Sequence, residues 1–315
     1  MAEGLDARLT EAVCRLLGRP LHDRERVGIA VSGGADSMAL VSLAARCWPG
    51  QVEAATVDHG LRPESTAEAA LVAQWCAGHD VPHASLKIAS ALEGNLQAAA
   101  RHARYELLGE WQQQRRLNWL MTAHHADDQL ETLVLRLNRG AGVGGLASIR
   151  ARRGSLLRPL LGEKRADLRR WCEDQQVPFV DDPSNENVRF DRVRTRQALA
   201  GCDLIDPTGL NRSLDALQEA DAALSWMVDR VGKKSLLLKE DCAILSRTDL
   251  PAELLRRLIL RMIAHLNPEA ENPRGPSLDQ ALVQLFDGKT VVLADCTLTG
   301  GECWTARRAP PRKLR

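Results

Sequence analysis

Short apolar segments alternate with longer helical patterns between residues 27 and 138, and this alternation constrains the fold more than any other feature. The candidate strands are residues 27–31, 52–58, 83–88 and 117–125. The candidate helices are the segment after residue 34, residues 64–79, a long segment from about residue 95, and residues 126–138. Strands separated by helices pair in parallel as βαβ units. The sequence therefore predicts an α/β fold with a doubly wound, mostly parallel, Rossmann-like sheet.

The second part of the chain has a different pattern. A basic, partly loop-like region covers residues 150–196, and a linker is predicted at residues 201–210. The elements predicted after the linker are a helix at 211–232, a hairpin at 235–246, a helix at 251–266 and a closing hairpin at 290–309 that turns at Gly300 and Gly301. These elements indicate a second, smaller α+β domain. We place the first domain at residues 1–205 and the second at residues 206–315.

Composition narrows the class of protein. The net charge is only +1, so a polyanionic partner has to be bound by local basic patches. The eight cysteines contain no C-x-x-C pair, so we expect reduced thiols rather than a zinc ribbon or a redox pair. No apolar run reaches the length of about 18 residues that a membrane span needs. We expect a cytoplasmic protein without membrane association, and a homodimer is among the oligomeric states that the sequence allows.

A glycine turn joins the first candidate strand to the helix that follows it. Its residues are Ser32, Gly33, Gly34, Ala35, Asp36 and Ser37. Paired glycines let the backbone approach a ligand, and the N–H groups of a helix start bind anions. The turn has neither the lysine of a Walker A loop nor the spacing of a dinucleotide turn. Its hydroxyl and amide groups suit pyrophosphate, and Asp36 suits Mg²⁺ bound between carboxylate and phosphates. An ordinary βα turn, with Asp36 complementing the helix dipole, is the alternative.

Polar residues also follow two other candidate strands. Asp58 and His59 follow the second strand, and His124 and His125 follow the fourth. The carboxyl ends of parallel strands meet at one edge of the sheet, where doubly wound folds bind ligands. We therefore expect these residues to converge with the glycine turn. Adjacent residues on a strand point in opposite directions, so we expect one histidine to orient a neighbour and the other to face a ligand, with metal binding as the alternative.

Three acids, Asp127, Asp128 and Glu131, lie at the start of the helix after the two histidines. Asp128 and Glu131 are three residues apart and share a helix face. Their simplest role is to complement the helix dipole. A carboxylate pair beside an anion site can also bind an amine and accept its proton.

Arginines gather on one helix and in two later runs. Arg101 and Arg104 share a face of the long helix predicted from about residue 95. The two runs are Arg150, Arg152, Arg153, Arg158, Lys164, Arg165, Arg169 and Arg170, and then Arg189, Arg192, Arg194 and Arg196. Each set is compatible with a solvated helix face. Each set is also compatible with contacts to nucleic-acid phosphates.

The glycine turn resembles the pyrophosphate loop of the N-type ATP pyrophosphatases, the PP-loop superfamily. Further stretches resemble one member family, the tRNA(Ile)-lysidine synthetases, over about residues 25–197. They are VDHGLRPES (57–65), GNLQAAARHARYELL (94–108), TAHHADDQLET (122–132), RPLL (158–161), DDPSN (181–185) and RVRTR (192–196). The family usually has R-N-R-I-R where this chain has Val193 and Thr195, so packing or an RNA contact is expected to differ there.

The resemblance implies an ATP-dependent ligase that joins lysine to C2 of the wobble cytidine of an isoleucine tRNA with a CAU anticodon. The cytidine is first adenylated, AMP and pyrophosphate are released, and the codon read changes from AUG to AUA. The implied domains are a catalytic PP-loop domain and a C-terminal tRNA-binding domain. A PP-loop tRNA thiolase and a non-catalytic tRNA-binding module are the alternatives.

The resemblance also implies roles for individual residues. The implied ATP-binding residues are Ser32 to Ser37, with Asp58 and His59. The implied catalytic residues are Asp36, Arg104, Asp128 and Glu131, and Asp128 and Glu131 also bind the substrate lysine. Arg101, Arg192, Arg194 and Arg196 are implied to bind tRNA.

Overall fold

The computed structural model describes residues 4–58, 64–88, 96–181, 191–199, 205–273 and 275–310. The chain divides into two compact units. The first comprises Met1–Leu135 and Ser148–Ser213, and the second comprises Arg136–Ala147 and Leu214–Arg315. The segment Arg136–Ala147 thus belongs to the second unit, although no sequence signal separates it from the helix before it.

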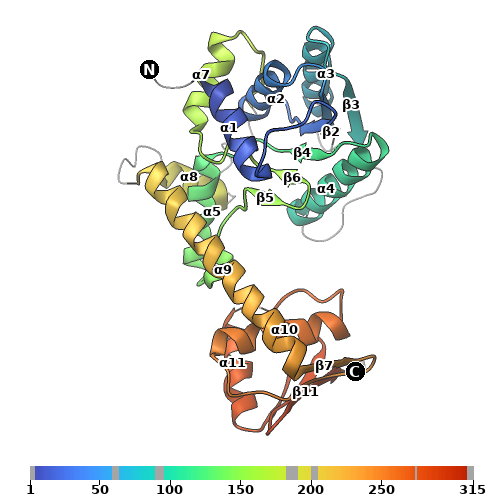
Figure 1. Cartoon of the computed structure of the whole chain (residues 1–315), viewed down its shortest axis with the longest axis vertical. Helices are drawn as coiled ribbons and strands as arrows, with labels where there is room; N and C mark the ends of the chain where they lie inside the picture. The colour runs from blue at the N-terminus through green and yellow to red at the C-terminus, as the bar shows by residue number, and fades with distance from the viewer. Residues whose placement is uncertain are drawn as a thin grey trace. The chain divides into compact units, whose positions relative to one another are not determined.

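The first unit is built on a six-stranded sheet (Figure 1). The strands in spatial order are β3 (His83–Lys87), β2 (Val52–Asp58), β1 (Val27–Ala30), β4 (Trp119–Met121), β6 (Leu156–Leu157) and β5 (Arg152–Arg153). All neighbours pair in parallel except β5, which is antiparallel to β6. This arrangement confirms the predicted doubly wound, mostly parallel α/β sheet.

Helices cover both faces of this sheet. The hydrophobic core on one face contains side chains of α1 (Leu5–Leu17), α2 (Ala35–Cys47), α3 (Glu64–Ala77) and α7 (Arg165–Asp174). The core on the other face contains side chains of α4 (Leu96–Gln114). The remaining helices of the unit are α5 (Ala126–Asn138), most of which belongs here, and α8 (Asp191–Leu199).

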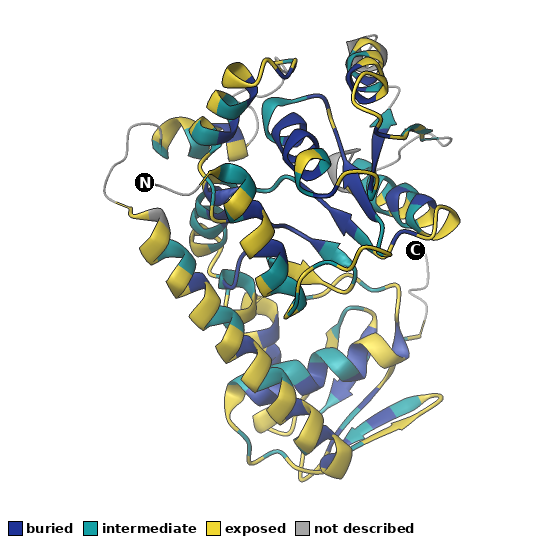
Figure 2. Ribbon diagram, turned by 45° about the horizontal axis from the view of Figure 1, so that its top comes forward, coloured by how far each residue is buried: buried dark blue, intermediate teal, exposed yellow. Residues whose placement is uncertain are grey.

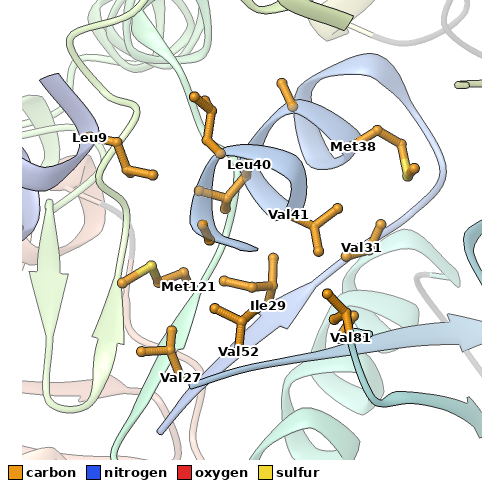
Figure 3. Close-up of a cluster of buried hydrophobic side chains, with 14 of the residues drawn as sticks. Leu9, Val27, Ile29, Val31, Met38, Leu40, Val41, Val52, Val81 and Met121 are labelled. Atoms are coloured by element: carbon orange, nitrogen blue, oxygen red, sulfur yellow. The ribbon is translucent and has the colours of Figure 1, made fainter. Parts of the chain in front are cut away.

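The sequence of β1 explains how the two faces differ. Val27 and Ile29 point to the face with α2, because alternate residues of a strand face opposite ways (Figure 3). Gly28 and Ala30 point to the face with α4 and are small. A Cβ atom at Gly28 would lie 2.6 Å from the ring of Trp111 on α4, so only glycine lets the helix pack this closely. β1 and the central part of α2 are buried throughout (Figure 2).

Residues 150–196, expected to be partly loop-like, contain more regular structure than the sequence indicated. They form the short β5–β6 hairpin, α7 and the start of α8. In α7 the apolar residues Leu168, Trp171 and Cys172 have helical spacing, but charged residues separate them and mask the pattern. The strands β5 and β6 are only two residues long and carry no periodic signal.

The second unit contains an antiparallel sheet with the order β7-β8-β11-β10-β9. Its strands are β7 (Leu236–Lys239), β8 (Cys242–Leu245), β9 (Thr290–Leu293), β10 (Cys296–Thr299) and β11 (Trp304–Arg308). Its helices are α6 (Val143–Leu146), α10 (Ala252–Leu266), α11 (Gly275–Phe286) and most of α9 (Pro207–Ser235). Side chains of α10 and α11 pack with β8, β10 and β11 in one core.

The predicted closing hairpin is part of a three-stranded meander. The extra turn lies at Ala294 and Asp295, which adopt left-handed conformations with φ of 49° and 55°. These angles belong to the tight turns that join paired strands, and the missing Asn-Gly signal explains why the sequence did not reveal the turn. Within the ranges given above, no helix is both long and apolar enough to cross a membrane.

Candidate active site

The strand order of the first sheet determines where a ligand site forms. From β1 the chain continues to β2 and β3 on one side, whereas β4 pairs with the other side of β1. The carboxyl ends of β1 and β4 therefore flank a topological switch point, the usual place for a ligand in open α/β sheets. The segments that follow these two strands carry the glycine turn and His124–His125.

The glycine turn between β1 and α2 is shaped by its own hydrogen bonds. The Ser32 N–H donates to Ser37 Oγ (3.1 Å), and the Ser37 hydroxyl donates to the Gly34 carbonyl (2.9 Å). Gly33 has φ of +89°, a conformation that L-residues rarely adopt, whereas Gly34 has an ordinary extended conformation with φ of −74°. The turn residues thus form a closed loop before the helix begins.

The start of α2 offers free amide groups beside this turn. Its first intrahelical bond joins the Met38 N–H to the Gly34 carbonyl (3.0 Å). The N–H groups of Ala35, Asp36 and Ser37 precede that bond and have no acceptor within the helix. Together with the helix dipole they form an anion site of the kind that binds phosphates.

Asp36 links the glycine turn to the end of β4. One of its oxygens, Oδ2, lies 3.4 Å from Nε2 of His125. The other, Oδ1, is buried and has no hydrogen-bond partner among the residues that the structure describes. A buried carboxylate oxygen without a partner is costly. Asp36 therefore has one oxygen available for a cation or a donor that a ligand supplies.

His125 is the centre of a charge network that crosses the switch point. Its side chain is 3% exposed and contacts Asp127 (Nδ1–Oδ2, 3.5 Å) and Asp128 (Nε2–Oδ2, 3.6 Å) as well as Asp36. Burial alone would lower the pKa of His125, but hydrogen bonds to Asp127 and Asp36 and the charge of Asp128 raise this pKa to about 10. The imidazole is therefore charged at neutral pH and holds three carboxylates around it.

Asp127 and Asp128 are fixed by additional contacts. Asp127 accepts the N–H of Arg165 at the start of α7 (2.9 Å), and Asp128 accepts the N–H of His125 (3.2 Å). The hydrogen bond with His125 is the main cause that lowers the pKa of Asp127 to about 2. Among the described residues, no group of three or more His, Cys, Asp or Glu side chains is arranged to hold a metal ion.

His124 has a different environment from its neighbour. Its Nδ1 shares a hydrogen bond with Thr122 Oγ1 (2.9 Å). Burial, followed by the positive charges of Arg158, Arg101, Arg104 and Arg192, lowers the pKa of His124 to about 3. This histidine is therefore neutral, and positive charge gathers around it.

Glu131 is buried, and α8 provides its partner. Arg196 donates to both oxygens of Glu131, through Nε (2.6 Å) and NH2 (3.2 Å). Arg192 of the same helix donates to Thr132 Oγ1 (3.3 Å). Two of the predicted tRNA-binding arginines thus contact α5. The sequence assigned Glu131 to lysine and Arg196 to tRNA, but in the structure these two residues form one ion pair.

The other residues of α8 have structural roles in this arrangement. Arg194 is exposed and pairs with Asp191 (2.5 Å). Val193, one of the departures from the family pattern, is buried. Thr195, the second departure, donates its hydroxyl to the Asp191 carbonyl (2.9 Å).

The remaining predicted site residues lie at the same edge of the sheet or outside the described chain. Arg101 packs over the ring of Tyr105, 5.3 Å from its centroid. Burial is the main cause that lowers the pKa of Arg104. Asp58 ends β2 and is partly buried, whereas His59 lies outside the described residues.

Two residues to which the sequence assigned no individual role occupy central positions. His125 joins the glycine turn to the acids, and Arg158 lies buried at the end of β6. The sequence signal for His125 was its position directly after a strand and before three acids. The signal for Arg158 was its place in the RPLL stretch, directly after two apolar residues.

Comparisons with known proteins identify the family. A family model described as a PP-loop domain matches residues 5–201. The tRNA(Ile)-lysidine synthase of Zymomonas mobilis is 42% identical over 314 residues, covering 96% of this chain and 94% of that protein. The chain belongs to the tRNA(Ile)-lysidine synthase family. Another member, from Novosphingobium aromaticivorans, is 42% identical and covers 91% of this chain and 90% of its own length. Membership of the family confirms the resemblance seen in the sequence.

A solved structure supports the fold alone. The U34-tRNA thiolase of Methanococcus maripaludis, solved with its [4Fe-4S] cluster, aligns with a TM-score of 0.57. The alignment covers 68% of this chain and 79% of the thiolase, at 16% sequence identity.

Proposed function

We propose that this protein joins lysine to the wobble cytidine of an isoleucine tRNA with a CAU anticodon, in a reaction driven by ATP. The family to which the chain belongs carries that activity in its name, and the PP-loop domain supports the use of ATP. The observation that carries the proposal is the network of Asp36, His125 and Asp128, because it joins a phosphate-binding turn to an acidic helix start within one site.

ATP binds with its phosphates at the start of α2. The amides of Ala35, Asp36 and Ser37 and the hydroxyl of Ser32 face the phosphates, and Asp58 at the end of β2 lies on the side where the nucleoside extends. The partnerless Oδ1 of Asp36 fits a cation. Asp36 would hold Mg²⁺ against the phosphates, where the ion neutralises part of their charge.

Adenylation takes place first. The O2 atom of the cytosine attacks the α-phosphorus of ATP, a new O–P bond forms, and the bond to pyrophosphate breaks. Arg104 stabilises the charge that develops on the α-phosphate, as a guanidinium in a desolvated site does well. The free amides of α2 hold the departing pyrophosphate.

Lysine transfer takes place second. The substrate ε-amine has an ordinary pKa of about 10.4 and must lose a proton before it attacks. Asp128 and Glu131 bind the ammonium group and take up this proton; the amine then attacks C2, and the C–O bond to AMP breaks. His125 contacts Asp128 and orients it for this role, while Glu131 is paired with Arg196.

The two alternatives are less well supported. Relatives that are 42% identical along almost the whole chain are lysidine synthases, whereas the thiolase similarity is one of fold. A non-catalytic module would not need a buried, partnerless carboxylate oxygen beside a phosphate site. Bound Mg²⁺, free lysine as the second substrate, a homodimeric assembly and a cytoplasmic location stay predictions.

Transfer of labelled lysine to purified tRNA tests the proposed function. The expected result is ATP-dependent incorporation into isoleucine tRNA with a CAU anticodon, with AMP and pyrophosphate as products. Methionine tRNA, which has the same anticodon, is the control and is expected to remain unlabelled. ADP among the products, or no incorporation by folded protein that binds ATP, would contradict the proposal.

A further inference from the structure

Positive charge is concentrated at one place in the active-site edge. The arginines whose charges act on His124 come from three elements and form what we call the arginine cluster: Arg101 and Arg104 of α4, Arg158 after β6, and Arg192 of α8. In the part of the chain that the structure describes, none of the four forms an ion pair.

Arg158 is the most deeply buried member of the arginine cluster, with 7% of its surface exposed. Its NH1 donates to the Arg150 carbonyl (2.7 Å), which fixes the side chain. Its Nε is buried and has no partner among the described residues. A guanidinium that is held in place with a free N–H is poised to donate to a ligand, because leaving the group unsatisfied is costly.

The surroundings of Arg158 favour an anion. His124 beside it is neutral and so adds no charge of its own, and Arg101 and Arg104 contribute two more guanidinium groups. Arg158 is buried and Arg104 is partly buried, whereas Arg101 and Arg192 are exposed. Neighbouring positive charges repel a buried guanidinium, and a bound anion relieves that repulsion. Planar guanidinium groups bind phosphate oxygens with paired N–H donors, so phosphate is the anion that this arrangement suits best.

We propose that the arginine cluster is a second phosphate-binding subsite, separate from the glycine turn, with Arg158 as its buried anchor. The inference rests on the proposed function and adds to it the way in which the substrate is held. The phosphate has two sources in that reaction, the α-phosphate of ATP and a phosphodiester of the tRNA next to the reacting cytidine.

Strand order favours the tRNA phosphodiester. The carboxyl ends of β2, β1, β4 and β6 follow one another along the sheet. Adjacent strands are about 4.8 Å apart, so the end of β6 lies roughly 10 Å from that of β1, which precedes the glycine turn. Nucleoside and phosphates of ATP occupy the β2–β1 side, and the acids lie at β4. A phosphate held by Arg158 therefore lies beyond the acids, on the side of the sheet away from the glycine turn, and this position suits the RNA better than the nucleotide.

Arg158→Gln tests the subsite through binding rather than turnover. The control is Arg153→Gln, which removes the same charge from an exposed position on the same hairpin. Affinity for the tRNA is measured over a range of KCl concentrations, and affinity for α,β-methylene ATP is measured by calorimetry. If the phosphate belongs to the RNA, Arg158→Gln weakens tRNA binding roughly tenfold and lowers the salt slope by about one, while nucleotide affinity is unchanged.

The other outcomes are equally decisive. Loss of nucleotide affinity with normal tRNA binding keeps the subsite and assigns it to the α-phosphate. Affinities within about twofold of those of Arg153→Gln for both ligands overturn the inference. If Arg158→Gln melts well below the wild type, Arg101→Gln provides the same comparison from an exposed member of the arginine cluster to which no role on ATP is assigned. A wild type that binds both ligands but makes no lysidine refutes the proposed function and leaves the subsite standing, and one that binds neither refutes both.

Discussion

Replacement of His125 by glutamine removes the positive charge that Asp36, Asp127 and Asp128 share. The folded-state pKa of His125 is raised from 6.5 to about 10. A raised pKa means that the stabilisation is fully present below about pH 6.5 and is lost as the pH rises through 10. The difference corresponds to an upper limit of about 4.8 kcal/mol. Because the Asp127 side chain is 51% exposed, solvent reduces this value, and we expect about 2–3 kcal/mol at neutral pH.

Urea unfolding of the wild type and of His125→Gln between about pH 7 and pH 10 measures this contribution. The wild type is expected to be more stable at pH 7, and its advantage is expected to shrink to near zero by about pH 10. His102→Gln is the matched control, because His102 is a histidine with a side chain that is 78% exposed. The unfolding free energy of His102→Gln is subtracted from that of His125→Gln at each pH. This difference cancels the effect of cysteine, tyrosine and lysine titration, because both variants retain those residues. A stability difference that stays constant over the range, or an NMR titration of His125 with a midpoint below about pH 7.5, would refute the reasoning.

Three further predictions concern the phosphate loop and the acidic helix. Gly33→Ala is expected to lower the free energy of unfolding by about 1–2 kcal/mol, because Gly33 has φ of +89°. Gly34 has φ of −74°, so Gly34→Ala is expected to lower it less. Thermal and urea unfolding of the two variants measure the difference. Asp36→Asn is expected to lower pyrophosphate release at least about 100-fold in a phosphate-coupled assay while the fold is retained, and release near the wild-type rate would remove Asp36 from the adenylation step. Glu131→Gln is expected to raise the lysine KM and to leave the adenylation rate unchanged. Arg196→Gln breaks the same ion pair but keeps the carboxylate, so it is expected to leave the lysine KM closer to that of the wild type. Equal effects of the two variants on the lysine KM would mean that the ion pair, and not the carboxylate, determines lysine binding.

The sheet and the phosphate loop could be predicted because their signals are local. Val27, Ile29 and Val31 place β-branched residues at alternate positions of the strand, and the glycines that follow stand next to the helix they precede. Neighbouring residues therefore determine both the turn and the free amides of α2. The order of the elements, together with the rule that parallel strands share one ligand-binding edge, then places Asp58 and His124 at that edge.

The interactions inside the site could not be predicted in the same way, because they join distant parts of the chain. Arg196 and Glu131 are 65 residues apart, and each has a plausible role alone; only the fold shows that they neutralise each other. The charge of His125 likewise depends on Asp36, which belongs to another βα unit. Arg158 is buried because it follows the β5–β6 hairpin, and the two-residue strands of this hairpin have no periodic pattern from which the sequence could predict them.

The hydrogen bonds between Ser32, Gly34 and Ser37 have one more consequence for the reaction. They hold the glycine turn in its binding shape through contacts within the protein alone. Little conformational entropy then remains to be lost when a ligand arrives, which is the advantage of preorganisation. In the proposed reaction the released pyrophosphate gains the same advantage and competes for the loop, so its removal from solution helps to drive turnover forward.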